Sequence, residues 1–169
     1  MAERPIVLFG DPVLREKAQP VEEVDRGIKD LVAEMIATLK KAKGLGLAAP
    51  QVGESKRIFL IDISAIELTE SMRVFINPKI LETSGEVLME EGCLSFPGIY
   101  QKIVRPEVVR IEATDVEGKK FTMRAEGMLA RAILHEYDHL EGKLFIDYFS
   151  PISRALLSGR LKKLATAAL

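Results

Sequence analysis

The two histidines of the chain lie four residues apart, in the stretch His135-Glu136-Tyr137-Asp138-His139. On a helix, residues at this spacing lie about 40° apart around the axis and one turn along it, so both imidazoles can reach one cation. Glu136 lies about 100° from His135 and can reach a water molecule at the metal without becoming a ligand. This H-E-x-x-H pattern therefore predicts two metal ligands and a base from one turn of helix.

The alternative is that both histidines are surface residues or hydrogen-bonded core residues. The motif follows the mostly apolar run MLARAIL, residues 128–134. Unpaired charge is costly to bury in such surroundings. The metal site is therefore the favoured interpretation.

A catalytic metal site usually has three protein ligands and one open position. After His139 the carboxylates are Glu141, which is directed elsewhere on the helix, and Asp147. A longer H-E-x-x-H-x-x-G-x-x-H pattern fails because its last position is Phe145. The lone thiol, Cys93, is the remaining donor, although a single cysteine is more often a small buried apolar residue. Two imidazoles and a thiolate suit zinc or iron(II) rather than magnesium or calcium.

Composition restricts the class of protein. With 169 residues, 47% hydrophobic and 29% charged, we expect one globular domain over residues 1–169. The net charge of −1 argues against a general nucleic-acid binder or a polybasic membrane binder. The longest apolar runs fall far short of the roughly 20 residues that span a bilayer. The N-terminus does not resemble a secretory signal or a transit peptide, and one cysteine allows no intrachain disulfide, so a cytoplasmic location is expected.

Apolar spacing and capping residues predict helices around the motif. They are a short helix from Asp11-Pro12 to about Lys17, then Val24–Lys43 stopped at Gly44, Gly127–Glu141 stopped at Gly142, and Ile152–Ala168. The helix over 127–141 is apolar on nearly every face before the histidines, which predicts that it is buried in the middle of the domain. The last helix is expected to be amphipathic, with one apolar side formed by Leu156, Leu157, Leu161 and Leu164.

Short β-rich segments lie between these helices. Strands are predicted at Arg57–Ile63, Met72–Ile76, Ile80–Thr83, Glu86–Met89, Val108–Ala113 and Lys119–Met123, with hairpin turns at Ser84-Gly85 and Asp115–Gly118. Too few helices separate the strands for repeated βαβ units. We therefore expect an α+β fold, with mainly antiparallel sheets packed around a buried central helix that carries the H-E-x-x-H motif, and with a C-terminal amphipathic helix.

The glycine-containing stretch GLGLAAPQVG, residues 44–53, has competing interpretations. Gly44-x-Gly46 could suggest phosphate binding. However, it lacks the third glycine of the dinucleotide motif and the Gly-Lys-Ser/Thr of a P-loop, and it follows a helix rather than a strand. Small residues could instead let a substrate backbone approach closely. Gly44 could also simply end the preceding helix.

Three stretches stand together in order: GLGLAAPQ at 44–51, EGCLS at 91–95 and HEYDHL at 135–140. This set resembles the peptide deformylase family in the order and spacing of its motifs, over nearly the whole chain. The resemblance implies removal of the N-formyl group from the N-terminal formyl-methionine of newly made polypeptides, with release of formate. It also implies one divalent ion, iron(II) or alternatively zinc or nickel, held by Cys93, His135 and His139.

The resemblance further implies roles for residues around the metal. Glu136 would be the general acid/base, and the Gln51 side chain and the backbone N–H of Leu94 would stabilise the oxyanion. Substrate-binding positions would include Gly46, Leu45, Tyr100, Met128 and Arg131. Met128 also follows from the residues themselves, since it lies seven residues before His135 on nearly the same helix face and can line an apolar pocket with Ala132. Each of these pocket residues could instead belong to the ordinary core or surface.

The acidic residues beside the ligands have two interpretations. Glu91 and Asp138 could orient an imidazole, or they could form a structural ion pair with Arg105. Expected partners are formylated nascent chains and the ribosome, without a membrane or a requirement for nucleic acid, and a monomer is expected. The competing functions are a metallopeptidase whose third ligand is Asp147 or an outside group, and a non-catalytic metal-binding protein, although a structural metal site needs no base such as Glu136.

Overall fold

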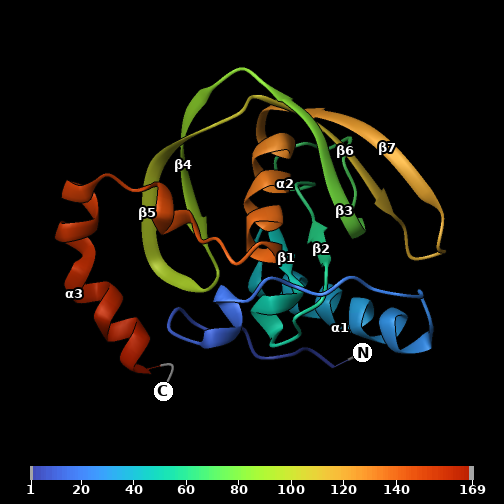
Figure 1. Cartoon of the computed structure of the whole chain (residues 1–169), viewed down its shortest axis with the longest axis horizontal. Helices are drawn as coiled ribbons and strands as arrows, with labels where there is room; N and C mark the ends of the chain where they lie inside the picture. Colours follow the sequence, from blue (N-terminus) through green and yellow to red (C-terminus); the bar gives the residue numbers. More distant parts are fainter. Residues whose placement is uncertain (1, 168–169) are drawn as a thin grey trace.

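The computed structural model describes residues 2–167. Helix α2 (Gly127–Leu140) runs through the middle of the molecule and carries both histidines (Figure 1). On one side lies a five-stranded sheet, and on the other side lies a two-stranded sheet. All strand pairs in both sheets are antiparallel. The expected α+β fold class is confirmed.

The larger sheet has the strand order β1-β2-β3-β6-β7. Its strands are β1 (Gly46–Ala48), β2 (Ile58–Ile61), β3 (Arg73–Ser84), β6 (Val108–Thr114) and β7 (Lys120–Glu126). The smaller sheet is the hairpin of β4 (Val87–Cys93) and β5 (Phe96–Arg105). The helices besides α2 are α1 (Arg26–Ala42) and α3 (Pro151–Ala167), with short 3₁₀ helices η1 (Pro12–Arg15), η2 (Ala49–Val52) and η3 (Phe145–Tyr148).

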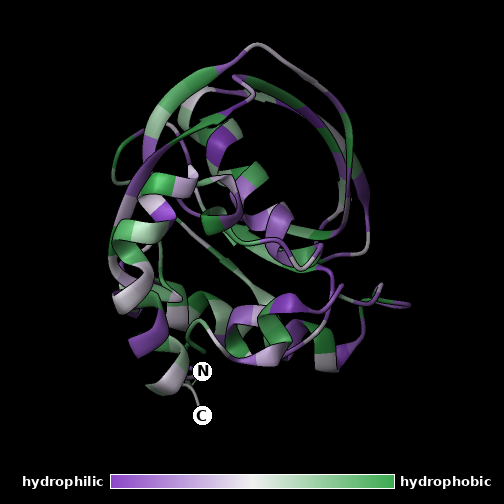
Figure 2. Cartoon of the chain, turned by 60° about the vertical axis from the view of Figure 1, so that its left-hand side comes forward, coloured by the Kyte–Doolittle hydropathy of each residue, from purple (hydrophilic) through white to green (hydrophobic). Residues whose placement is uncertain are grey.

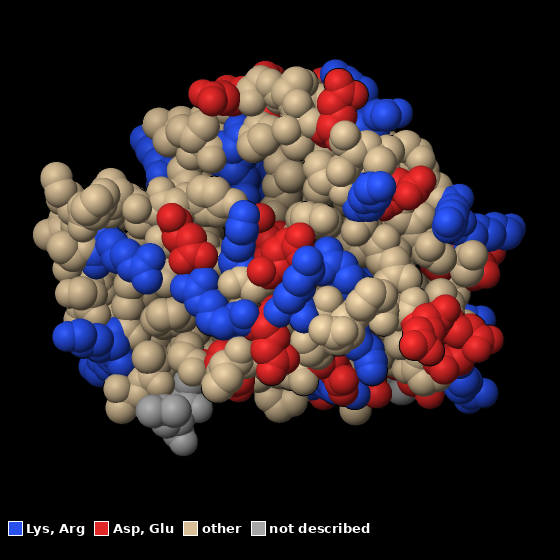
Figure 3. Space-filling view, viewed as in Figure 1, with Lys and Arg blue, Asp and Glu red and all other residues tan. Residues whose placement is uncertain are grey.

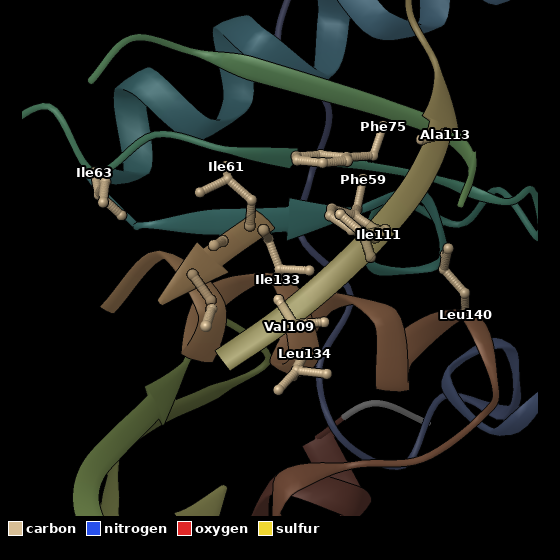
Figure 4. Close-up of a cluster of buried hydrophobic side chains, with 14 of the residues drawn as sticks. Phe59, Ile61, Ile63, Phe75, Val109, Ile111, Ala113, Ile133, Leu134 and Leu140 are labelled. Atoms are coloured by element: carbon tan, nitrogen blue, oxygen red, sulfur yellow. The ribbon is translucent and has the colours of Figure 1, made fainter. Parts of the chain in front are cut away.

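Helix α2 is held in place by apolar contacts with the larger sheet. Its Ile133, Leu134 and Leu140 join a buried cluster with strand residues that include Phe59 and Phe75, whose rings stack at 4.7 Å (Figure 4). Full burial of a side chain of this size contributes about 1.5–3 kcal/mol. The apolar run before the histidines therefore fixes the helix that carries them.

Strand β2 is buried on both faces because a helix covers each side of the sheet. Phe59 and Ile61 join the cluster of α2, whereas Ile58 and Leu60 join a second cluster. The second cluster includes the apolar side of α1, namely Ile28, Leu31, Val32, Met35 and Leu39. Apolar and polar residues accordingly alternate around the helices in Figure 2. A continuous apolar run in a strand is typical of such two-sided burial.

Helix α1 is present as predicted, but Gly44 does not end it. The helix ends at Ala42, and Lys43 caps it in the left-handed conformation (φ 58°), with its N–H donated to Leu39 O. Gly44 is small for another reason, because a Cβ there would lie 2.8 Å from Cδ1 of Leu94. The helix stop thus comes from Lys43, and Gly44 allows the close approach of the segment that follows β4.

The predicted hairpin at Ser84-Gly85 is wrong. Glu86–Met89 does not pair with Ile80–Thr83, because β3 pairs with β6 and β4 pairs with β5. Gly85 does turn the chain, with φ +73°, but it directs β4 to the other side of α2. The two predicted strands Met72–Ile76 and Ile80–Thr83 belong to one strand, β3, which begins at Arg73 and has an irregularity between Ile76 and Lys79.

Other predictions agree with the structure more closely. The turn at Asp115–Gly118 joins β6 and β7, and the Asp115 carboxylate accepts hydrogen bonds from the N–H groups of Glu117 and Lys119. The short helix after Asp11 is present as η1, although it ends at Arg15 rather than near Lys17. The prediction did not include β1 or β5.

Helix α3 packs on the side of the smaller sheet. Leu161 is buried, and Leu157 and Leu164 contact the cluster that contains Phe96 and Ile103 of β5. Leu156, however, is 81% exposed, so its assignment to the packed side is wrong. Leu156 lies about 100° around the helix from Leu157, so it points away from the side of α3 that contacts this cluster. The predicted end of this helix, Ala168, lies outside the described residues.

Within residues 2–167, no helix combines the length and the apolar character required to cross a bilayer. Lys and Arg are interspersed with Asp and Glu over most of the face in Figure 3.

The turn after α2 generates a stability prediction. Gly142 has φ +73°, and a Cβ there would lie 2.6 Å from the carbonyl oxygen of Arg15. We expect Gly142→Ala to lower the free energy of unfolding by about 1–3 kcal/mol through backbone strain and steric overlap. Urea unfolding monitored by circular dichroism measures this change.

Gly159 provides the matched control because it lies in α3, where a Cβ added to it would meet no atom within 4 Å. Gly159→Ala should be neutral or stabilising by up to about 1 kcal/mol, as alanine favours helix. Equal unfolding free energies for the two variants would contradict the strain assigned to Gly142.

Candidate metal centre

The end of strand β4 meets the last two turns of α2. This meeting brings together Cys93, His135 and His139, whose ligand atoms all lie within 4.8 Å of one another. Cys93 Sγ is 3.5 Å from Nε2 of His139. Both histidines are buried and Cys93 is partly buried. The structure thus places the thiol left open by the sequence beside the two imidazoles.

The other candidate for a third ligand, Asp147, has different partners. Its carboxylate accepts a hydrogen bond from the N–H of Leu144 at 3.0 Å and pairs with Arg15 at 2.8 Å. Within residues 2–167, Asp147 lies outside the group of donors that could hold an ion. It caps η3 instead, and Phe145 at the last position of the longer motif is buried in the apolar cluster below.

The orientation of His135 is set by a buried carboxylate. Nδ1 of His135 lies 2.8 Å from Oε1 of Glu91, which leaves Nε2 free to face the donors. Glu91 also accepts two hydrogen bonds from Arg105 and one from Arg131. Both interpretations of Glu91 therefore apply, since it orients an imidazole and pairs with Arg105. Burial raises the pKa of Glu91, but the bonds from His135 and Arg105 outweigh it and lower the value to about 2.

The pKa values of the two imidazoles shift in opposite directions. Burial lowers the pKa of His135, yet Cys93, Glu136 and Glu91 raise it well above its usual value. Burial, together with the charges of His135 and Arg105, lowers the pKa of His139 well below its usual value. The surrounding groups thus favour one positive charge at the two rings, and they disfavour protonation of both imidazoles at once.

A divalent transition metal fits this site. The donor set of one thiolate and two imidazoles is typical of zinc or iron(II). Among the described residues, Oε1 of Glu136 and Nδ1 of His139 are buried side-chain atoms without a hydrogen-bond partner. A buried carboxylate oxygen without a partner is costly, and a nearby cation with its solvent would compensate it.

Glu136 lies against the edge strand β1. Its side chain is buried, and burial raises its pKa to about 7. A carboxyl group with this pKa can both accept and return a proton near neutral pH. A Cβ at Gly46 would lie only 2.5 Å from Oε2 of Glu136. Gly46 therefore makes room for the carboxyl group, a role that sequence reasoning missed. This carboxyl group also disfavours the phosphate-binding interpretation of the loop.

Gln51 presents its amide nitrogen toward the donors. Its Oε1 accepts a hydrogen bond from the N–H of Ala48 at 2.9 Å. Its Nε2 donates to Oγ of Ser95 at 3.1 Å and lies 3.6 Å from Sγ of Cys93. Ser95 is fully buried and was not singled out from the sequence, although it closes the motif EGCLS. These contacts fix which end of the amide faces the site.

A cavity of about 570 Å³ opens onto these groups. Every site residue predicted from the sequence lines it except His139, which is buried beneath, and its apolar wall contains Leu45, Met128 and Ala132. Tyr100 lies at the wall and is largely exposed, and Leu94, which follows Cys93 in the chain, also lines the cavity. Arg131 also lines the cavity, but its guanidinium donates to Glu91 and to two carbonyl groups of the hairpin.

Comparisons with known proteins give a consistent family. A sequence model described as polypeptide deformylase matches residues 3–155. The peptide deformylase of Mesorhizobium japonicum is 44% identical over 96% of this chain and 93% of its own length. Peptide deformylase 1 of Clostridium perfringens is 52% identical over 88% of this chain and 99% of its own length.

Solved structures agree with the sequence comparisons. The crystal structure of peptide deformylase from Thermus thermophilus has a TM-score of 0.90 and 40% identity, and the match covers 98% of this chain and 99% of that chain. The structure of a peptide deformylase from Legionella pneumophila has a TM-score of 0.89 and 43% identity, with coverage of 96% and 95%.

The donor set generates a prediction about metal content. We expect the protein to retain about one equivalent of divalent metal through gel filtration and Cys93→Ala to lose most of it, because two imidazoles alone bind more weakly. Asp147→Asn should retain the wild-type content. Elemental analysis of both variants decides between the two third ligands, and the reverse pattern would remove Cys93 from the site.

Proposed function

The chain belongs to the polypeptide deformylase family, and from this membership we propose how its own side chains carry out the family's reaction. It is an enzyme that removes the N-formyl group from the N-terminal formyl-methionine of newly made polypeptides and releases formate. The observation that supports the assignment of residues is the convergence of Cys93, His135 and His139 beside the buried carboxyl group of Glu136.

We propose that these three donors hold one divalent ion. The chemistry that such an ion supplies is polarisation of a carbonyl group and a lowered pKa of water. Iron(II) is the proposed ion, with zinc or nickel as alternatives. The thiolate and two imidazoles support a transition metal of this kind over magnesium or calcium.

Glu136 is the proposed proton carrier. It accepts a proton from the water molecule whose oxygen attacks the formyl carbon. It returns that proton to the amine nitrogen as the C–N bond breaks, so that formate and a free amino terminus leave. Its burial and its position beside the donors support both steps, because a single carboxyl group near the reacting atoms can act first as base and then as acid.

Gln51 and the backbone N–H of Leu94 are the proposed donors to the oxygen that becomes negative during attack. The fixed amide of Gln51 supports this role, since a donor that is already oriented loses little energy to reorganisation. The loss of one such donor typically lowers turnover about 100- to 1,000-fold. Ser95 is proposed to keep the amide in place.

The methionine side chain is proposed to enter the apolar part of the cavity along α2, near Met128, Ala132 and Leu45. Tyr100 is proposed to contact the substrate at the wall, and Gly46 to let its backbone come close. A direct substrate contact by Arg131 remains a prediction, although its three hydrogen bonds to the hairpin favour a supporting role.

Because the substrates are newly made chains, we propose that the enzyme works in the cytoplasm close to the ribosome. Helix α3 contains basic side chains and no acidic residue, which supports contact with a polyanion. At the α3 end of the molecule in Figure 3, the charged side chains on view are blue. We propose that the enzyme is a monomer, and measurement of its mass in solution tests this.

The proposed function is tested with a formyl-methionyl peptide and an unformylated peptide that offers only internal bonds. We expect formate release from the first and no cleavage of the second. Glu136→Gln should bind the metal normally and lose at least about 100-fold in kcat, because the amide cannot accept and return the proton. Cleavage of internal bonds alone would favour a metallopeptidase, and full turnover by Glu136→Gln would remove its role.

Gly46 provides a second test. Gly46→Ala forces a methyl group against the Glu136 carboxyl group, so we expect kcat to fall at least about tenfold with metal content unchanged. Gly27→Ala is the matched control, because Asp25 Oδ1 lies 3.4 Å from its added Cβ, an ordinary distance. Formate release per bound metal is the measurement. Wild-type kcat in Gly46→Ala would contradict the tight fit.

A further inference from the structure

The hydrogen bonds that orient His135 do not end at Glu91. Arg105 uses Nε and Nη2 for Glu91 and directs its remaining nitrogen, Nη1, to Oδ2 of Asp138 at 2.9 Å. Asp138 lies on α2 between the two histidine ligands. The side chain of Arg105 is 3% exposed, and each of its three nitrogens donates a hydrogen bond within the protein. One planar guanidinium thus joins Glu91, the partner of His135, to the Asp138 carboxylate of the helix that carries both histidines.

Tyr148 covers the outer end of this chain of contacts. It belongs to η3, after α2, and its hydroxyl donates to Oδ2 of Asp138 at 2.8 Å. Its ring lies against the guanidinium of Arg105, 4.9 Å from the ring centroid to the guanidinium carbon. Burial, followed by the hydrogen bond to Asp138, raises the pKa of Tyr148 to about 12, which keeps the phenol protonated as a donor.

We propose that Tyr148 is a positioning residue for the metal ligand His135 and acts through Asp138, Arg105 and Glu91. This inference rests on the metal site of the proposed function. The hydroxyl holds the carboxylate of Asp138 in position for Nη1, and that bond fixes the rotation of the guanidinium. The guanidinium in turn holds Glu91, which sets the plane of the imidazole.

Two features separate this role from general packing. Tyr148 does not line the cavity, so its loss does not remove a substrate contact. Its ring also shields the Arg105–Asp138 pair from water on one side, and charged hydrogen bonds are stronger where solvent is excluded. An effect of Tyr148 is therefore expected in the affinity for the metal rather than in the KM for the peptide.

The chain offers a matched pair of substitutions. Tyr148→Phe keeps the ring over Arg105 and removes only the hydroxyl. Tyr137→Phe makes the same change on α2 itself, between the histidines, where the ring faces Arg57 at 5.6 Å instead. Asp138→Asn tests the next member of the chain, since it keeps an acceptor oxygen and loses the charge.

The experiment titrates apo-protein with cobalt(II) and zinc(II) against a chelator of known affinity, and it records the cobalt absorption spectrum. Direct partners of a ligating histidine typically contribute about 10- to 100-fold in metal affinity. We expect a smaller weakening, of about 3- to 10-fold, for Tyr148→Phe, because Tyr148 lies three contacts beyond Glu91, the direct partner of His135. The weakening should be larger for Asp138→Asn, which lies one contact closer to the metal. Tyr137→Phe should stay within about twofold of wild type, and KM should not change in any of the three.

Wild-type affinity and an unchanged cobalt spectrum in Tyr148→Phe would overturn the inference, whatever its thermal stability. Equal weakening by Tyr148→Phe and Tyr137→Phe would also overturn it, because a general loss of stability would then explain both. If the wild-type protein bound neither ion, the proposed metal site itself would fail and the inference with it. Binding by wild type with no effect of Tyr148→Phe would leave the proposed function intact.

Discussion

The buried carboxylate of Glu91 is the constraint on which the site depends. The hairpin β4–β5 and helix α2 belong to different parts of the fold, and Cys93 reaches the histidines only because the two are held together. Glu91 makes this connection with His135 of α2, Arg131 of α2 and Arg105 of β5. Burying such charges gains little net stability, since desolvation offsets the attraction. The hydrogen bonds of Glu91 instead fix one relative position of the hairpin and the helix.

The apolar core fixes the other side of α2. Phe59 and Phe75 pack against the helix from the larger sheet, so α2 cannot shift to follow the hairpin. The site then lies where apolar packing ends and charged contacts begin. Two residues near the site do not follow the usual preferences of their surroundings. Lys43 has a left-handed backbone just before β1, and position 46 is a glycine within a strand because the Glu136 carboxyl group occupies the space of a side chain. Close approach of three segments, rather than strand or helix preference, explains these positions.

Sequence reasoning succeeded where the relevant signal was local. The spacing of His135 and His139 defines their geometry once a helix is assumed, and the turn at Asp115–Gly118 depends on nearby residues alone. It failed where pairing was decided over long distances. Ser84-Gly85 does turn the chain, but nothing nearby shows that β4 pairs with β5 instead of β3. For the same reason the residues alone left the third ligand open. The family resemblance implied Cys93, and the fold brings its Sγ close to the two imidazoles.

Charge balance connects the supporting contacts to the metal. Glu91 and Asp138 carry two negative charges, and the guanidinium groups of Arg105 and Arg131 supply two positive charges in contact with them. In the proposed metal site, the thiolate form of Cys93 and the carboxylate form of Glu136 would add two more negative charges. Neutral imidazoles cannot compensate these, whereas one divalent cation can. The two arginines therefore do not balance the negative charge of the donors, and a divalent ion at the proposed site would supply the two missing positive charges. In the proposed reaction, uptake of a proton by Glu136 changes this balance by one unit.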